Sequence, residues 1–545
     1  MSEKDHTMPQ GDVGRDHIKA NSASNSEDTK RDATLPELGG GAADERDVER
    51  GHQPLEKPRT AGSDNGASQQ DPKLVTWDGP DDPENPKNWP GRKKWVTMGI
   101  VSLFTLISPV SSTMVAPALP AISADLHITS EFVSQLTLSI FILAYAIGPL
   151  FLGPLSETYG RSIVLQLANL FYLAFNIGCG FAKTQGQLIA FRFLSGLGGS
   201  VPLVVGGGVL GDSFPPEKRG SASAIYSLAP LLGPSVGPIF GGFVAENTTW
   251  RWVFWATSIA TGVMQVAGVL WLRETYAPRI LKKKAKKLRK ETGDPSYQTE
   301  EERQNQTLTK RLQTATIRPF KLLATQPIIQ VLALYMAYIY GLMYLMLSTF
   351  PTLWTDPDYY HESTGIGGLN YISLGLGAFL GAYLCAYFND RLFKRLKARN
   401  NDVGKPEYRL PLLSIVTVCV PAGLFIYGWT AQTHAHWIAP NIGACVFAIG
   451  NMMTFQCMQT YIVDTYTKYA ASAMAAVSVL RCLTAFGFPL FAPYMYDALD
   501  YGWGNSVLAF ISLGIGIPAP IFLWMFGEKL RKASPYAAEK DAGAK

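Results

Sequence analysis

The hydrophobic positions of this chain, from Trp95 onward, are grouped in long runs that are separated by short polar stretches. A helix needs about 20 predominantly apolar residues to cross the hydrocarbon core, where its backbone polar groups can be satisfied only within the helix. The pattern therefore predicts twelve membrane-spanning helices. We expect them near residues 95–120, 131–153, 162–182, 187–211, 220–245, 251–272, 327–350, 363–388, 409–430, 436–462, 470–495 and 505–527.

A polar, lysine-rich break at 273–326 interrupts the series after the sixth run. Because six runs stand on either side of it, we predict an all-α membrane protein whose twelve transmembrane helices form two pseudo-symmetric six-helix bundles. The expected domains are an N-terminal bundle at 92–273, a basic cytoplasmic linker at 274–326, a C-terminal bundle at 327–530 and a cytoplasmic tail at 531–545.

Residues 1–91 have a different composition from the rest of the chain. They carry 11 Lys or Arg against 19 Asp or Glu and almost no apolar clusters, whereas 47% of the whole chain is hydrophobic. Such a segment cannot bury enough apolar surface to offset the entropy lost on ordering. We predict a disordered acidic cytoplasmic tail. It contains no apolar stretch suited to a cleavable signal, so the first span is expected to target the chain.

Basic residues between the runs are concentrated on one side of the predicted membrane. The run "LKKKAKKLRK" at 281–290 and the loop at 389–408 fall on that side, whereas the opposite loops contribute essentially Lys183 and Arg251. We therefore expect both termini to be cytoplasmic, in the plasma membrane or, as the alternative, in the vacuolar membrane. Next to a membrane helix, the basic run is interpreted as a topology determinant touching anionic lipid rather than as a nucleic-acid-binding segment.

The stretch "GPLSETYGR" at 153–161 places a carboxylate and a guanidinium at the junction of the second and third runs. In so short a loop, Glu157 and Arg161 can pair with each other or with a neighbouring helix end. Gly153 would let two backbones approach closely. An ordinary polar turn is the alternative interpretation.

Two further stretches are unusual for apolar helices. Arg192, in "FRFLSGLGGS", lies inside the fourth run, where a charge is costly unless it faces a partner or a cavity, or reaches the membrane surface. The fifth run contains "APLLGPSVGPIFGG", in which prolines at 230, 234 and 238 and glycines at 233, 237 and 241 each recur every four residues. These two registers predict a bent and closely packed helix.

In order and spacing, the stretches at 153–162, 192–200 and 229–242 resemble the signature motifs of the major facilitator superfamily. The segments "DPENPKNWP" at 82–90, "GDSFPPEKRG" at 211–220, "YIVDTYTKYAAS" at 461–472 and "FPLFAPYMY" at 488–496 are similar to those of its fungal drug:proton antiporter branch with twelve spans. The resemblance implies a proton-coupled exporter of drugs, toxins or secondary metabolites that works by alternating access.

The resemblance also implies roles for particular residues. Glu157 and Arg161, with Gly153 and Gly160, would form a gate that latches the two bundles, although many members have aspartate at the place of Glu157. Arg192 would take part in proton transfer. The hinge or seal of exporters would consist of Gly233, Pro234, Gly237, Pro238, Gly241 and Gly242.

The position of charges inside the runs bears on the substrate. A transporter of cations should hold a carboxylate deep in its pocket, but the acidic residues lie only near the ends of the runs: Glu131, Asp212, Glu246, Glu362, Asp390 and Asp464. The deep charges are Arg192 and Arg481. We therefore expect small lipophilic substrates that are neutral or weakly acidic. Asp212 and Asp464 are the remaining candidates for proton coupling.

Polar and aromatic side chains in the middle of the runs are candidates for a broad-specificity substrate site. Hydrogen bonding between helices, away from any ligand, is the alternative for each of them. The candidates are Gln135, Tyr338, Tyr340, Tyr344, Asn370, Tyr371, Asn451, Gln456, Gln459 and Arg481.

Other classes of function find little support in the sequence. We see no nucleophile–base or metal constellation of an enzyme, all six cysteines lie in apolar runs, and we expect no cofactor and no metal. The expected partners are a small-molecule substrate, protons and the lipid bilayer, with the protein a monomer. A polyamine or other organic-cation exporter, an uptake carrier and a non-transporting sensor are the alternatives. The sequon at Asn247 is a candidate for glycosylation.

Overall fold

The structure, a computed structural model, describes residues 73–214, 216–303 and 308–537. No strand longer than an isolated bridge occurs in these ranges, so the fold is all-α, as predicted. The first six spans are α1 (Gly91–Thr113) extended by η3 (Ala116–Ala118) and α2 (Leu119–Asp125), α3 (Glu131–Tyr159), α4 (Arg161–Gly180), α5 (Gln185–Gly199) with α6 (Val201–Ser213), α7 (Pro216–Asn247) and α8 (Arg251–Trp271).

The second six spans have the same arrangement along the chain. They are α12 (Pro327–Thr355), α13 (Thr364–Leu369) with α14 (Tyr371–Arg399), η4 (Pro406–Arg409) with α15 (Leu410–Val416) and α16 (Cys419–Gln432), α17 (Ile438–Thr465), the first part of α18 (Ala470–Gly516), and the last part of α18 with α19 (Pro518–Ala533). A short η5 (Thr467–Tyr469) precedes α18.

The number of spans agrees with the prediction once two helices are considered separately. By length and hydropathy, ten stretches of the described residues could cross a membrane. The last of these, at 470–533, holds two spans, because α18 runs across a break at Asp500, whose φ of 51° is not helical. The 32-residue helix α7 is the remaining one. The physical basis is that each predicted apolar run forms a helix that satisfies its own backbone.

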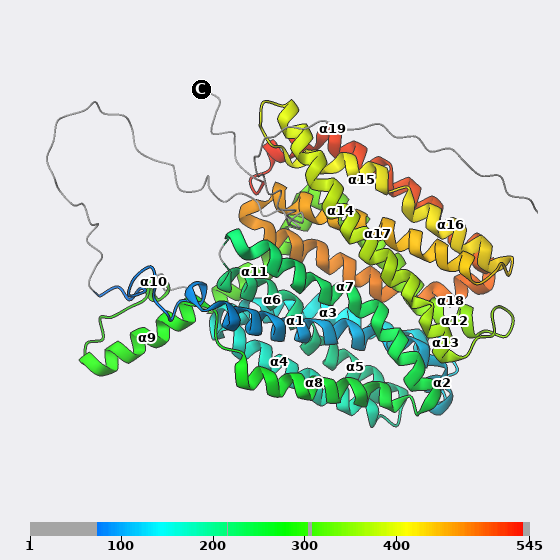
Figure 1. Cartoon of the computed structure of the whole chain (residues 1–545), viewed down its shortest axis with the longest axis horizontal. Helices are drawn as coiled ribbons and strands as arrows, with labels where there is room; N and C mark the ends of the chain where they lie inside the picture. Colours follow the sequence, from blue (N-terminus) through cyan, green and yellow to red (C-terminus); the bar gives the residue numbers. More distant parts are fainter. Residues whose placement is uncertain (1–72, 215, 304–307, 538–545) are drawn as a thin grey trace, which may run out of the picture. The chain divides into compact units, whose positions relative to one another are not determined.

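The helices pack into two bundles that touch each other along α3 and α7 of the first bundle (Figure 1). In the first bundle α1 packs on α7, and α5 packs on α3 and α4; in the second, α12 packs on α18, and α17 packs on α14 and α16. Between the bundles, α3 contacts α18, and α7 contacts α13 and α14. We call the side that carries α10 and α11 the linker face, and the side that carries α2 and α13 the opposite face.

The break between the bundles contains three helices, α9 (Ala277–Thr292), α10 (Glu300–Arg303) and α11 (Leu308–Thr325). α11 contacts both bundles, through α3 on one side and α12 and α18 on the other. The hydroxyl of Thr316 donates to the Leu150 carbonyl of α3 at 3.4 Å, and the Arg318 guanidinium lies 5.3 Å from the ring of Tyr469. The predicted basic linker is therefore partly a helical bridge between the bundles.

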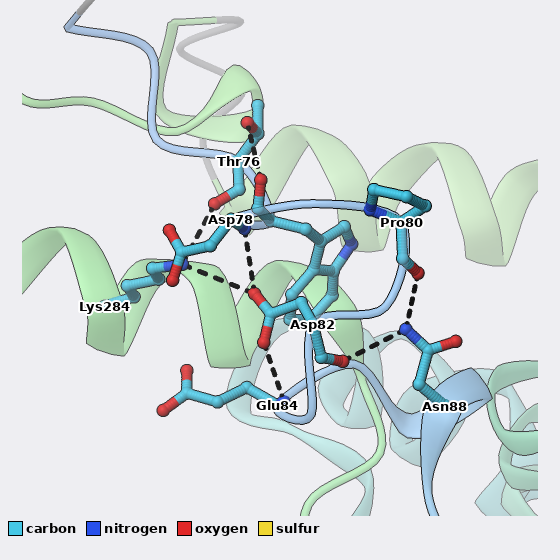
Figure 2. A network of polar contacts seen from close by, with 8 residues as sticks. Thr76, Asp78, Pro80, Asp82, Glu84, Asn88 and Lys284 are labelled. Carbon is cyan, nitrogen blue, oxygen red and sulfur yellow. Dashed lines mark hydrogen bonds and ion pairs between the residues drawn. The ribbon is translucent and has the colours of Figure 1, made fainter.

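Residues 73–90 precede α1 and dock against α9 through a buried carboxylate (Figure 2). Asp82 accepts hydrogen bonds from the backbone N–H of Asp78 at 2.9 Å and of Glu84 at 2.8 Å. The Lys284 ammonium of α9 lies 2.7 Å from Asp78 Oδ1 and 3.5 Å from Asp82 Oδ2. The buried Val75 donates its backbone N–H to the carbonyl of Gln298 at 2.9 Å.

Two predicted boundaries are therefore wrong in part. Residues 1–72 of the predicted tail lie outside the described residues. Residues 73–90 do not belong to a structureless segment, because Lys284 of α9 supplies a cation and Gln298, beyond the end of α9, pairs with their backbone. At the other end, α19 continues to Ala533, and Arg531 pairs with Glu407 at 3.1 Å. The C-terminal bundle thus extends past the predicted limit at residue 530.

Candidate transport site and gates

Arg161 begins α4 and is the centre of an ion cluster on the linker face. Its Nε lies 3.4 Å from Asp212 Oδ2, and its Nη1 donates to Ser156 Oγ at 2.7 Å. Its backbone N–H donates to Glu274 Oε1 at 2.8 Å. Its Nη2 lies 3.8 Å from Oε1 of the exposed Glu157. Ser156, Glu157 and Asp212 belong to the first bundle, and Glu274 belongs to the segment that follows α8. Arg161 therefore ties α3, α4, α6 and this segment together, and none of these four partners lies in the second bundle.

The predicted turn at 153–161 is mostly helical, because α3 continues to Tyr159. Gly160 alone makes the turn, with a φ of 100°, and a Cβ at this position would overlap the Glu274 carboxylate. Glycine is thus required there for both conformation and space. Gly153 does not have the predicted role, because a Cβ added to it would lie 3.4 Å from Val204 Cγ1, an ordinary contact.

A second ion cluster repeats this arrangement in the C-terminal bundle. Arg409, at the end of η4, donates to Asp390 Oδ1 at 2.8 Å and to Asp464 Oδ2 at 3.0 Å. These carboxylates come from α14 and α17, which hold the places that α3 and α6 hold in the first bundle. The two carboxylates among the three proton-coupling candidates, Asp212 and Asp464, are therefore each paired with an arginine. Arg409 was not among the residues predicted from the sequence, although its position before an apolar run matches that of Arg161.

Arg192 is fully buried and points into a cradle of backbone carbonyls. It donates to the carbonyl oxygens of Ser111, Ser112, Thr137 and Leu138 at 3.1–3.3 Å. Ser111 and Ser112 end α1, where carbonyl groups lack helical partners and the helix dipole is negative. The guanidinium therefore caps α1 and joins it to α3. It does not extend to the membrane surface, and each hydrogen bond that it makes goes to the main chain.

The two four-residue registers of the helix-five motif on α7 pack against two different neighbours, α1 and the second bundle. Cβ atoms added at Gly233, Gly237 and Gly241 would meet Pro109, Thr113 and Met114, so this register packs on α1. The register of Pro234, Pro238 and Gly242 faces the second bundle: a Cβ at Gly242 would lie 2.6 Å from the Thr364 carbonyl oxygen, and one at Gly368 would lie 3.1 Å from that of Pro238. The predicted close packing is found, and one register forms an interface between the bundles.

Glu246 completes this interface at the opposite face. Its Oε2 accepts a hydrogen bond from the Gly365 backbone N–H at 2.6 Å and from Ser363 Oγ at 3.2 Å. The carboxylate thus connects the end of α7 to the start of α13. In the sequence Glu246 was one of several acidic residues near helix ends, and no local signal indicated that it joins the bundles.

An aromatic cluster surrounds Arg481 where α3 meets α12 and α18. The guanidinium carbon lies 4.7 Å from the ring centroid of Tyr340 and 5.3 Å from that of Phe455. The Tyr340 ring lies 5.2 Å from that of Tyr344, and Tyr344 packs in one cluster with Tyr145 of the first bundle. Three predicted substrate residues are therefore together. Phe455 and Tyr145 were not predicted from the sequence, because they lie on separate helices.

The other substrate candidates divide into two groups. Tyr338, Tyr371 and Asn451 are buried and donate to backbone carbonyls of Leu508, Leu347 and Ile339, and Asn370 donates to Glu362 and accepts from Asn441 at the opposite face. These four make the helix-to-helix hydrogen bonds of the alternative interpretation. Gln135 is buried on α3, and Gln456 and Gln459 are half-buried on α17. Within the part of the chain that the structure describes, their side chains have no hydrogen-bond partner that would exclude a role in binding.

Two remaining features concern modification and metals. Asn247 is exposed at the last position of α7, and its Nδ2 donates to the Phe243 carbonyl at 2.9 Å. Across residues 73–214, 216–303 and 308–537, no three His, Cys, Asp or Glu side chains are placed to ligate a metal ion.

The family model of the Major Facilitator Superfamily matches residues 101–489. The chain belongs to this superfamily. It is a multi-pass membrane transporter and not an enzyme. Efflux pump vrtL of Penicillium aethiopicum is 54% identical, over 86% of this chain and 92% of that protein. Efflux pump radE of Floropilus chiversii is 42% identical, over 87% of each.

Solved structures of the superfamily have the same fold. The xylose transporter XylE of E. coli, in a partially occluded inward-open conformation, has a TM-score of 0.58 and 14% identity, over 80% of this chain and 98% of its own. At that identity the likeness concerns the fold alone. It supports the assignment of two six-helix bundles and carries no information on the substrate of this superfamily member.

Proposed function

We propose that this transporter exports small lipophilic compounds, neutral or weakly acidic, in exchange for protons and by alternating access. The observation that carries the proposal is the interface between α7 and the α13–α14 pair, which runs from Ser235 to Glu246 and closes the opposite face. Such an interface fits a carrier whose two bundles rock about a site between them. The two relatives named as efflux pumps support the direction of transport.

The distribution of charge supports the substrate class. Asp212, Asp390 and Asp464 are paired with arginines on the linker face, and Glu246 and Glu362 are hydrogen-bonded at the opposite face. The aromatic cluster at mid-depth contains a cation, Arg481, and no acidic side chain is among its described members. A polyamine would have to lose its hydration there without a counter-charge, which is costly.

The remaining parts of the proposal concern the cell. The basic linker and the loop at 389–408 favour a cytoplasmic linker face, with both termini inside and the protein in the plasma membrane, or alternatively in the vacuolar membrane. We further propose that the protein acts as a monomer. Glycosylation at Asn247 would require the opposite face to be extracellular, and its place at a helix end leaves little room for the modifying enzyme.

Transport by the purified full-length protein in liposomes tests the proposal. We expect an imposed proton gradient to drive 2-naphthoate and its methyl ester, but not spermidine, and a proton ionophore to abolish the movement. Movement of spermidine in place of the two naphthalene compounds would favour the organic-cation exporter. Fluxes that are the same with and without the proton gradient would contradict proton coupling. The absence of flux for every compound would favour the non-transporting sensor.

A further inference from the structure

The two arginines inside the membrane differ in how their hydrogen-bond donors are used. Arg192 donates to four backbone carbonyls and is fully buried. Arg481 has a buried Nε that finds no hydrogen-bond partner among the described residues. A buried donor without a partner is costly, and more so when it is charged. Arg481 is therefore the membrane arginine that has a free donor for a ligand.

The depth of Arg481 suits a transport site. It stands eleven residues into α18, which begins at Ala470. At about 1.5 Å per residue this is about 17 Å along the helix, roughly the middle of a hydrocarbon core of about 30 Å. A cation at that depth requires a counter-charge or a polar cavity.

The rings beside Arg481 have the geometry of a stacking platform. Tyr340 and Phe455 lie with their centroids 6.2 Å apart at an interplanar angle of 27°, and the guanidinium covers both. Both side chains are only half-buried, as is Arg481 itself. Flat rings at such distances favour an additional aromatic ring in offset or edge-to-face contact.

The first bundle contributes the other wall of the cluster. Tyr145 of α3 packs with Tyr344 and Cys482, and its hydroxyl is hydrogen-bonded to Ser108 of α1. Groups of both bundles therefore lie near Arg481. A ligand bound between them would contact both, as alternating access about a shared site requires.

We infer that Arg481, Tyr340 and Phe455 form the binding site for a planar aromatic acid, with its carboxylate or phenolate on the guanidinium and its ring on the two side-chain rings. The acid accepts a charge-assisted hydrogen bond from the unpaired Nε, which offsets the desolvation cost of both charges. The inference rests on the proposed function, since it names the substrate class of the same transporter.

Equilibrium binding to the purified full-length protein in detergent tests this site. The probes are 2-naphthoate and methyl 2-naphthoate, which share the ring and differ in charge. We expect Arg481→Gln to weaken 2-naphthoate about ten- to hundredfold, as the loss of one charge-assisted hydrogen bond predicts, with the ester affected less than about threefold. Arg481→Lys keeps the positive charge, so it should retain part of the preference for 2-naphthoate over its methyl ester. Phe455→Leu should weaken both probes alike, by about two- to tenfold.

Lys286→Gln on the exposed side of α9 is the control for loss of a positive charge. If Arg481→Gln weakens acid and ester equally, or neither, the site assignment is wrong. Should Arg481→Gln unfold, the ratio of the affinities of Arg481→Lys for 2-naphthoate and for its methyl ester decides the question in the same way. Because binding needs no gradient, these results are independent of transport. Binding without proton-driven flux would contradict the proposed function alone, and flux of the acid with unchanged affinity in Arg481→Gln would contradict this inference alone.

Discussion

Glu246 and Gly365 join the two bundles at the opposite face, with 2.6 Å between the carboxylate oxygen and the backbone nitrogen. A carboxylate is a stronger acceptor than an amide, so Glu246→Gln should weaken this contact by about 1 kcal/mol. We expect the fraction of molecules open on this face to rise about fivefold. Distances between spin labels at positions 248 and 358, one on each bundle, measure the change.

A matched control for this variant is Asp125→Asn. Asp125 is a carboxylate on the same face, but its partner at 2.8 Å, Arg251, belongs to the same bundle. Gly365→Ala should open the face as well, because its Cβ would overlap the Glu246 carboxylate. An unchanged distance distribution in both interface variants would show that the glycine and proline contacts alone close the face.

Asp212 and Glu157, the two acidic residues that pair with the Arg161 guanidinium, should differ in importance. Asp212 is largely covered and lies 3.4 Å from the guanidinium, whereas Glu157 is 58% exposed and lies 3.8 Å away. Exposed ion pairs contribute little, about 0–1 kcal/mol. We expect Asp212→Asn to slow transport about tenfold and Glu157→Gln about twofold or less, both with substrate affinity within a few-fold. Initial rates in liposomes and binding in detergent measure the two effects. A larger loss for Glu157→Gln would restore it as the main gate residue.

Arg192 should matter first for stability. Arg192→Leu leaves the carbonyls of Ser111 and Ser112 buried without partners, at a cost of about 1–3 kcal/mol for each. We expect a lower thermal transition of the purified protein and a reduced yield. Arg192→Lys should be intermediate, because an ammonium offers three donors from one nitrogen whereas the guanidinium spreads five donors over three nitrogens. A variant with unchanged thermal stability but altered dependence of transport on pH would instead support the proton-transfer role that the resemblance implies.

Two glycines of similar secondary structure should respond oppositely to alanine. A Cβ at Gly241 of α7 would overlap the backbone carbonyl of Met114, whereas one at Gly207 of α6 meets nothing within 4 Å. Gly241→Ala should destabilise the protein by about 1–3 kcal/mol through overpacking. Gly207→Ala should stabilise it by up to about 1 kcal/mol, since alanine restricts the unfolded chain. Thermal unfolding of the two variants provides the comparison.

Docking of residues 73–90 on α9 should not depend on pH in the neutral range. The backbone N–H of Asp78 holds the pKa of Asp82 below its ordinary value, burial opposes this, and the N–H of Glu84 and Lys284 add to the lowering. Because docking lowers the pKa of Asp82, its carboxylate stabilises the docked segment fully at pH values above the unfolded pKa of about 3.9. This stabilisation is lost only as the pH falls through the lowered pKa of the folded state. Hydrogen exchange of the backbone amides of Asp78 and Glu84 should be protected equally at pH 6 and pH 8.

Asp82→Asn tests the same segment. It removes the charge that Lys284 and the two amides share, so their protection should be lost while the bundle helices keep theirs. Asp81→Asn, one residue away and exposed, is the control. Equal protection in wild type and Asp82→Asn would mean that the Val75–Gln298 pairing holds the segment by itself.

The sequence was sufficient for the number and approximate positions of the spans, because apolar runs of this length have one way to satisfy their backbone in a membrane. It also indicated the close packing of helix five, since glycines four residues apart necessarily share a face. The spacing of glycines and prolines within α7 can be read directly from neighbouring positions in the sequence. Even so, the sequence placed the gate in a loop where α3 is still helical, because Glu157 and Tyr159 look the same in a polar turn as in the last turn of a helix.

Partners that lie far apart in the chain could be decided only by the tertiary structure. Arg192 and Arg481 are equivalent as sequence, each a cation within an apolar run, and only the fold gives one a cradle of carbonyls and the other a pair of rings with an unpaired donor. The same holds for Glu246 and for Asp82, whose partners lie on other segments. Hydropathy fixes which residues enter the membrane. The energy of a charge there depends on its neighbours in space, and packing alone determines those.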